Sequence, residues 1–160
     1  LTKIFLSDIL LPRFIMIKRI KQSDKELFLT LSREFYRSEA VLHDIPEEYH
    51  KRTFDELMRS QDYAQGYLLC LKEGTPVGYA LTAKTFSHEA GGTVIWVEEI
   101  YIRPEFRGKG LGKSFFRYVD TLGAARLRLE AEQDNDHAIT LYRALGYKPL
   151  SYVQMIKERK

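Results

Sequence analysis

The chain has 160 residues, a length that suits one domain able to bury about two-thirds of the surface of its unfolded chain. Hydrophobic residues make up 44% of it and charged residues 29%, the balance of an ordinary globular protein. A net charge of +3, with the basic residues scattered, argues against a nucleic-acid partner. No stretch is long and apolar enough for a membrane span, so we expect no membrane partner and a cytoplasmic location.

The first fifteen residues read differently from the rest of the chain. They are apolar, but Asp8, Pro12 and Arg13 interrupt the run and no cleavage site follows, so a signal peptide is not predicted. We expect residues 1–15 to be an N-terminal extension or an expression remnant, and residues 16–160 to form the folded domain.

Hydrophobic periodicity and turn residues divide the rest of the chain into strands and helices. Strands are predicted at 15–20, 67–72, 77–86, 93–102 and 125–131, with one broken or two short strands at 147–156. Helices are predicted at 23–38, 46–60, 114–123 and 135–146. This order, β-α-α-β-β-β-α-β-α-β, predicts a single α/β (α+β) domain whose mixed, largely antiparallel sheet has helices on both faces.

Cysteine and histidine give no sign of a metal site. Cys70 is the only cysteine, which excludes an intramolecular disulfide and a cysteine-based zinc site. It lies in an apolar run, where a buried structural thiol is favoured over a nucleophile. His43, His50, His88 and His137 have no ligand spacing, so each is interpreted as a surface or internally hydrogen-bonded histidine.

The most informative stretch is residues 93–113, TVIWVEEIYIRPEFRGKGLGK. The strand should end before Pro104, which cannot donate to a ladder, and a glycine-rich basic turn then leads into a helix. Glycines let backbone N–H groups converge on an anion, and a helix N-terminus adds positive charge. The pattern predicts a pyrophosphate cradle, meaning a turn whose backbone amides surround the anion. The alternative is a solvated basic turn.

Spacing distinguishes between known phosphate-binding loops. A nucleotide P-loop would need glycine where Arg107 stands. The dinucleotide fingerprint G-x-G-x-x-G does not fit either. Started at Gly108 it would need glycine in place of Lys113, and started at Gly110 it would need glycine in place of Phe115. The pattern Arg107-x-x-Gly110-x-Gly112 instead resembles the R/Q-x-x-G-x-G/A signature of the GNAT N-acetyltransferases.

A second stretch carries the same resemblance. Residues 135–147, NDHAITLYRALGY, are similar to the family motif N-x-x-A-x-x-L/F-Y-x-x-L/x-G-F/Y. The predicted order of elements is also that of the GNAT fold, so the resemblance extends over residues 16–156.

The resemblance implies that acetyl-CoA enters a notch where the fourth and fifth strands splay apart. Its implied ligands are the backbone of Ile100, Tyr101 and Ile102, the turn Arg107, Gly108, Lys109, Gly110, Leu111, Gly112 and Lys113, and the pair Asn135 and Ala138. Tyr142 would lie near the thioester sulfur and protonate the leaving thiolate, which a phenol of pKa about 10 can do. The alternative for Tyr142 is a packing aromatic on an amphipathic helix.

Two adjacent carboxylates lie in the predicted central strand. Alternation puts Glu98 on the face of Ile100 and Ile102, and Glu99 on the face of Tyr101. A carboxylate among apolar neighbours has a raised pKa, which suits a general base acting on an ammonium. The strand also resembles that of the diamine acetyltransferases. We favour Glu98 as the base, with Glu99 second and a structural salt bridge as the remaining alternative.

The implied reaction is direct transfer of an acetyl group from acetyl-CoA to a primary amine, without an acyl-enzyme. The loop between the first two helices usually covers the acceptor in this family. Here it contains Glu39, Asp44, Glu47 and Glu48, which either attract a polyamine-like amine or form a solvated helix start.

Two alternative functions remain open at this point. One is acetylation of a protein N-terminus or lysine side chain, and the other is a non-catalytic CoA-binding regulatory module. Many family members are dimers in which the final strands take part, so the resemblance also implies a homodimer.

Overall fold

The computed structural model describes residues 15–39, 41 and 43–159. The predicted N-terminal extension, apart from Ile15, therefore lies outside the described residues. The described residues divide into two units, the first ending at Glu130 and the second beginning at Ala131.

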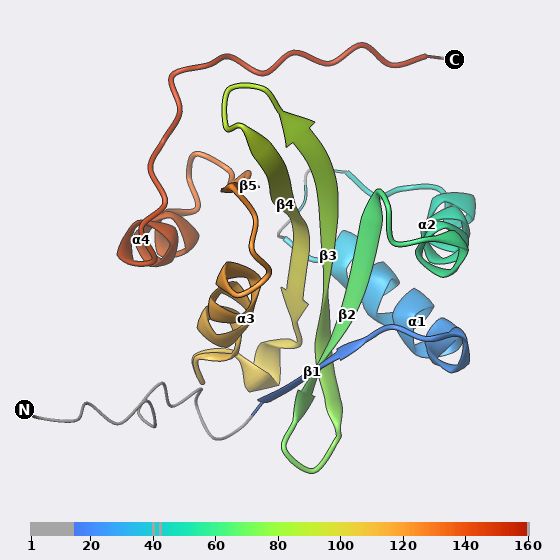
Figure 1. The fold of residues 1–160 in the computed structure, drawn as a ribbon. Coiled ribbons are helices and arrows are strands. Elements are labelled where there is room, and N and C mark those ends of the chain that lie inside the picture. Colours follow the sequence, from blue (N-terminus) through green and yellow to red (C-terminus); the bar gives the residue numbers. More distant parts are fainter. Residues whose placement is uncertain (1–14, 40, 42, 160) are drawn as a thin grey trace, which may run out of the picture. The chain divides into compact units, whose positions relative to one another are not determined.

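The first unit contains a five-stranded sheet in the order β1-β2-β3-β4-β5 (Figure 1). Its strands are β1 Ile15–Arg19, β2 Ala64–Leu71, β3 Pro76–Ser87, β4 Gly92–Ile102 and β5 Arg126–Leu129. Its helices are α1 Lys25–Tyr36, α2 Glu47–Arg59 and α3 Leu111–Asp120, with 3-10 turns at Gln22–Asp24 and Pro104–Phe106. β1 to β4 are antiparallel neighbours and β5 is parallel to β4, so the predicted mixed, largely antiparallel sheet is confirmed.

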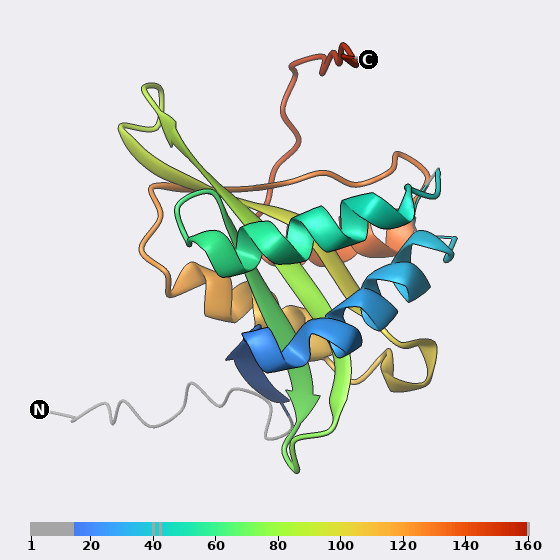
Figure 2. The same ribbon diagram turned by 90° about the vertical axis from the view of Figure 1, so that its right-hand side faces the viewer.

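Helices cover both faces of this sheet, as predicted. On one face, Phe28 of α1 packs between Phe54 of α2 and Tyr79 of β3, with ring centroids 5.9 and 5.6 Å apart. On the other face, Phe115 of α3 packs against Tyr67 of β2 at 5.7 Å. Figure 2 shows α1 and α2 running across one side of the sheet and α3 on the opposite side. These five aromatic side chains are fully buried, and removing their apolar surface from water stabilises the unit.

A β-bulge interrupts β4 in its middle. Leu81 of β3 pairs with Glu99, but the next residue, Thr82, pairs with Val97. Glu98 is therefore the extra residue, without a partner on β3. The alternation used in the sequence analysis does not hold across this point, because the bulge shifts the phase of the strand by one residue.

β4 also loses its second neighbour at the bulge. The ladder with β5 joins Val94 to Arg126 and continues only as far as Val97 and Leu129. Beyond it, residues 98–102 of β4 have no strand partner on that side among the described residues. We call this segment the open edge of β4, because no strand of the described residues pairs with its backbone on that side.

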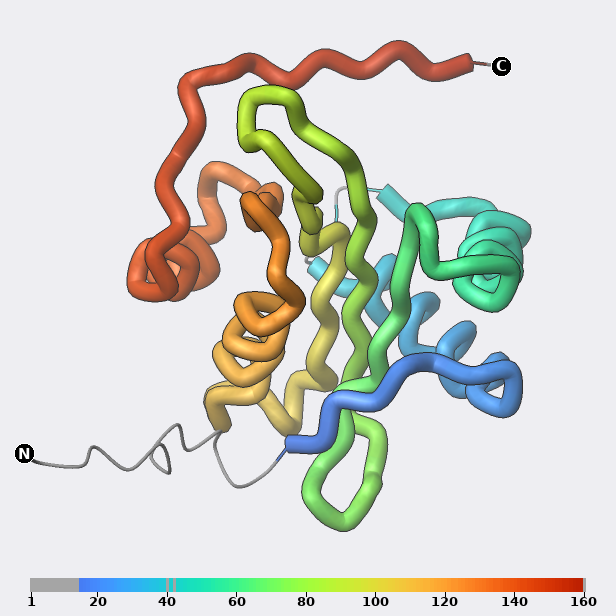
Figure 3. Tube along the Cα trace, viewed as in Figure 1, coloured from blue at the N-terminus to red at the C-terminus, as the bar shows by residue number. Residues whose placement is uncertain are grey.

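The second unit contains α4, Asp136–Ala144. Asn135 caps this helix, its side chain accepting a hydrogen bond of 3.1 Å from the amide of Ala138. Gly146 ends it with a φ of 91°. From residue 147 to 159 the chain forms no helix or strand (Figure 3), so the predicted final strands are wrong. The apolar pattern is present, but within this unit no neighbouring strand pairs with it, and a strand without a partner is not stable.

Candidate active site

Two arginines fix the chain where β4 ends. Arg103 forms a two-pronged ion pair with Glu34 of α1, at 2.8 and 2.9 Å, and this pairing holds the pKa of Glu34 below its usual value. Arg107 folds back so that its Nε donates a hydrogen bond of 2.8 Å to the carbonyl of Ile102. Its guanidinium also lies 5.9 Å from the ring centroid of Tyr101. The start of the glycine-rich turn is thereby held against the end of β4.

The turn has the backbone that an anion cradle requires. Gly108 and Gly110 have φ values of 74° and 76°, in the left-handed region that side chains disfavour. A Cβ at either position would have no atom within 4 Å, so the space beside both is open. Gly110 is the N-cap of α3, and the first amides of a helix lack an intrahelical partner. The predicted turn and helix start are confirmed, and the residues fit a pyrophosphate.

The start of α3 lies against the open edge of β4. A Cβ on Gly112 would be 3.8 Å from Ile102 and 3.9 Å from Ile100. These are contacts with the Cδ1 atoms of the two isoleucine side chains, so the first turn of α3 packs against the open edge of β4.

Glu99 is held by two tyrosines. Tyr36 of α1 donates a hydrogen bond of 2.7 Å to its Oε1, and Tyr79 of β3 donates one of 2.5 Å to its Oε2. Burial raises the pKa of Glu99, while the two hydroxyl donors oppose this shift. Both oxygens of the Glu99 carboxylate are therefore engaged, on the sheet face that α1 and α2 cover.

A further polar pair extends this network toward α2. Ser32 of α1 and His50 of α2 are both buried, and Oγ of the serine lies 2.8 Å from Nδ1 of the histidine. Ser32 also lies close enough to Tyr79 to oppose the rise in the pKa of that tyrosine, which burial causes. Burial lowers the pKa of His50 and so favours the neutral form of its ring. The interpretation of His50 as an internally hydrogen-bonded histidine is confirmed.

Glu98 is in a different environment. As the bulged residue it is accessible to solvent, yet the protein packed around it raises the pKa of its carboxyl group. The negative charge of Glu130, which follows β5, raises it further. Of the two adjacent carboxylates, Glu98 is the one that a ligand at the open edge could reach.

Two of the four acidic residues that were expected near the acceptor, Glu47 and Glu48, lie in the first turn of α2 and pair with arginines. Glu47 accepts from Arg33 at 2.5 Å, and this ion pair lowers the pKa of Glu47 to about 2. Glu48 lies 3.7 Å from Arg52, one turn along the same helix. These pairs favour the interpretation of Glu47 and Glu48 as a solvated helix start over a surface that collects polycations.

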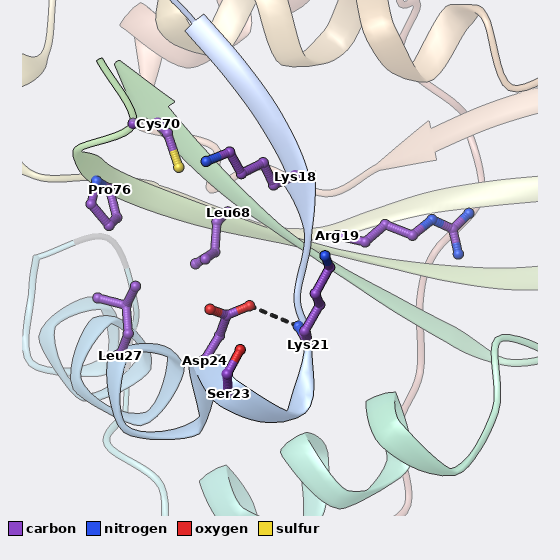
Figure 4. A pocket seen from close by; sticks show the side chains of 10 residues that line it. Lys18, Arg19, Lys21, Ser23, Asp24, Leu27, Leu68, Cys70 and Pro76 are labelled. Carbon is purple, nitrogen blue, oxygen red and sulfur yellow. Dashed lines mark hydrogen bonds between the residues drawn. The ribbon is translucent and has the colours of Figure 1, made fainter. Parts of the chain in front are cut away.

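A separate cavity of about 520 Å³ lies beside β1, and none of the predicted site residues lines it. Figure 4 shows Lys18 of β1 and Cys70 of β2 above it, with Asp24 on the opposite wall. Cys70 is only 1% exposed, and burial raises the pKa of its thiol. The interpretation of Cys70 as a structural thiol is confirmed.

In the second unit, the residues of the second motif lie on α4 and just after it. The ring of Tyr142 is 6.1 Å from that of Tyr147, and burial raises the pKa of Tyr142. Asn135 has a structural role as the N-cap. The roles of Tyr142, Asn135 and Ala138 toward a cofactor stay predictions.

Within the part of the chain that the structure describes, no helix is long and apolar enough to cross a membrane. Nor do three or more histidine, cysteine or acidic side chains gather there as a group that could hold a metal ion.

The sequence analysis missed the hydrogen-bonding partners of Glu99. Tyr36 is 63 residues away from it in sequence, and no local pattern relates the two. The bulge did leave a signal in the sequence. In a regular strand, two adjacent carboxylates would face opposite sides of the sheet, and in an otherwise apolar strand this would bury one of them on either face.

Comparison with known proteins gives the family to which this fold belongs. The model of the acetyltransferase (GNAT) family matches residues 26–147, so the chain belongs to that family. It is an N-acetyltransferase, as its two sequence motifs indicated.

Similar proteins differ in what their names say they acetylate. Thialysine N-epsilon-acetyltransferase of Bos taurus is 29% identical over 154 residues, which cover 86% of each chain. The aminoglycoside acetyltransferase AAC(6')-Iy, solved with a bisubstrate analog of CoA and acetylneamine, has a TM-score of 0.72 at 17% identity, over 91% of this chain and 99% of its own. A ribosomal-protein-alanine N-acetyltransferase of Brucella melitensis has a TM-score of 0.69 at 17% identity, over 90% of this chain and 99% of its own.

Proposed function

We propose that this enzyme takes the acetyl group from acetyl-CoA and transfers it directly to a primary amine of a small molecule. The observation that supports this most is the open edge of β4. The strand bulges at Glu98, loses its neighbour β5 at the same point, and ends beside a turn with two left-handed glycines. Backbone groups without a strand partner next to an anion cradle suit a long ligand with a pyrophosphate at one end.

The residues fit acetyl-CoA in two places. The turn amides from Arg107 to Lys113 would hold the pyrophosphate, since the open space beside Gly108 and Gly110 admits an anion. The backbone of residues 100–102 would hold the pantetheine arm and the thioester carbonyl. A backbone N–H directed at that oxygen is an oxyanion donor, worth about 3 kcal/mol in other enzymes. When bound, acetyl-CoA supplies an activated acetyl group on a good leaving thiolate.

Glu98 and Tyr142 are proposed as base and acid. Glu98 removes a proton from the attacking ammonium, directly or through water, because it is accessible and its raised pKa is closer to neutrality. Glu99, whose oxygens already accept from two tyrosines, anchors β4 to α1 and β3. Tyr142 donates a proton to the thiolate, and its raised pKa keeps it protonated until then. Direct transfer is favoured because Cys70 is buried in β2 and not available as a nucleophile.

A small-molecule amine is favoured as acceptor because three of the curated relatives that match most of this chain are named for the epsilon amine of thialysine. A protein N-terminus or lysine is the second candidate, since another relative that covers 84% of this chain is named a peptidyl-lysine N-acetyltransferase.

The test is thermal unfolding with and without acetyl-CoA, followed by thiol release with a panel of amines. A ligand at about 100 times its Kd should add roughly 2.7 kcal/mol to the free energy of unfolding, a clear rise in Tm. The panel should contain spermidine, small amines, amino acids and a peptide. A rise in Tm with turnover of a small amine supports the proposal. Turnover of the peptide alone would favour the protein acceptor, and no rise in Tm would overturn the cradle.

A further inference from the structure

Arg128 is a half-buried cation without an acidic partner. It lies on β5 opposite Trp96 of β4, and its guanidinium is 4.1 Å from the centroid of the indole ring. Among the described residues, no carboxylate forms an ion pair with it. Arg126, two residues earlier on the same strand, is paired with Glu89 at 2.9 Å. Half-buried charges usually have a partner, so the unpaired guanidinium needs an explanation.

The position of Arg128 relates it to the candidate active site. Trp96 pairs with Ala83 and Glu99 pairs with Leu81, two residues apart on β3, so Trp96 and Glu99 lie on the same sheet face. The contact of Arg128 with the Trp96 ring places its guanidinium on that face too. Because the ladder between β4 and β5 ends one residue later, Arg128 is the last side chain of β5 on this face before the open edge.

The chemistry of this pair suits a carboxylate. A guanidinium stacked on an indole still directs its N–H groups outward in its own plane. A carboxylate in that plane can accept two hydrogen bonds from it at once. The stacking also restricts the arginine, so less conformational entropy is lost on binding. An ammonium group, in contrast, would be attracted to the acidic end of the site, where the charge of Glu130 raises the pKa of Glu98.

We propose that Arg128, stacked on Trp96, binds the carboxylate of the acceptor, so that the acceptor is an amino acid whose distal amine is acetylated. This inference rests on the proposed function. Trp96 and the proposed base Glu98 are two residues apart on β4, a separation of roughly 7 Å at about 3.3 Å per residue. An extended amino acid with its amine at the end of the side chain, such as lysine, has about this reach, and an α-amino group does not.

The experiment compares lysine with cadaverine, which differ only by the carboxylate. The wild-type enzyme should prefer lysine in kcat/KM. Arg128→Gln should lower kcat/KM for lysine by about 10- to 100-fold, the effect of losing a charged hydrogen-bonding partner, mostly through KM. Turnover of cadaverine should stay within about twofold, since that acceptor makes no use of the guanidinium. Arg126→Gln is the matched control, because it removes the same group from the same strand, and it should leave the preference unchanged.

A second readout does not depend on turnover. Trp96 is the only tryptophan of the chain, so the intrinsic fluorescence excited in the indole band reports on this site alone. Lysine added to the enzyme with CoA should change the emission in a saturable way in the wild type and in Arg126→Gln, and not in Arg128→Gln.

The contrary results are distinct. Equal loss of lysine and cadaverine turnover in Arg128→Gln, or a wild-type preference for cadaverine, would overturn the carboxylate site and leave the acetyltransferase proposal standing. If acetyl-CoA fails to raise Tm and no amine is acetylated, the proposed function fails, and this inference fails with it.

Discussion

The hydroxyl of Tyr36 lies 2.7 Å from a carboxylate oxygen of Glu99, although 63 residues separate the two in sequence. This hydrogen bond joins the end of α1 to β4 at the residue next to the bulge. It therefore connects the element that precedes the predicted acceptor loop to the strand that would bind the cofactor.

Tyr36→Phe should destabilise the protein by about 1–3 kcal/mol at neutral pH, because the part-buried carboxylate of Glu99 loses a donor. The raised pKa of Glu99 means that the folded state binds its proton more tightly than the unfolded state. Stability therefore falls as the pH rises from the ordinary glutamate range through the raised pKa. Without Tyr36 this fall should be larger, so the loss measured by urea unfolding should be greater at about pH 7.5 than at about pH 5.

Tyr49→Phe is the control for that substitution, because its ring is half exposed on α2 and its hydroxyl forms none of these bonds. A loss for Tyr36→Phe that is the same at both pH values would show that the hydroxyl does not support the charged form of Glu99.

Glu98→Gln should lower kcat by about 10²–10⁴-fold and flatten the acidic limb of the pH–rate profile, since an amide cannot accept the proton of the amine. The profile of kcat/KM against pH, taken with saturating acetyl-CoA, is the measurement. Persistence of the acidic limb in this variant, with its loss in Glu99→Gln, would transfer the role of base to Glu99.

Glu130→Gln tests the same assignment without touching the base. The charge of Glu130 raises the pKa of Glu98, so removing that charge should move the acidic limb to lower pH. Glu132→Gln, two residues further along and without this influence on Glu98, serves as the control. An acidic limb at the same pH in Glu130→Gln and the wild type would mean that Glu98 does not determine it.

Gly110→Leu should abolish measurable binding of acetyl-CoA while the protein stays folded. The φ of 76° is unfavourable for leucine by about 1–2 kcal/mol, and its side chain would occupy the open space of the cradle. Gly91→Leu is matched, because Gly91 has a φ of 64° and equally open surroundings in the turn before β4. Calorimetric titration should show lost affinity only in Gly110→Leu, and equal affinity in both variants would refute the cradle.

Tyr142→Phe should reduce kcat and leave the Kd of acetyl-CoA nearly unchanged, because the ring remains and only the proton donor is lost. Tyr152→Phe, at an exposed tyrosine of the C-terminal segment, provides the comparison. An unchanged kcat would return Tyr142 to a packing role, beside Tyr147 on the second unit.

Local chemistry explains what could be predicted from the sequence. The glycines of the turn, Pro104 after the strand and the Asn135 cap each act within a few residues, so the turn, the end of β4 and the start of α4 are readable without a structure. The GNAT motifs consist of the same local features, which is why the family was recognisable.

Tertiary structure decided the rest, because the deciding partners are distant in sequence. The ladder with β3 made Glu98 a bulged residue, and the packing of α1 brought Tyr36 to Glu99. The parallel pairing of β5 placed Arg128 on Trp96. The segment after α4 has the apolar pattern of a strand and forms none, since a strand needs a neighbour for its backbone groups and sequence periodicity does not supply one.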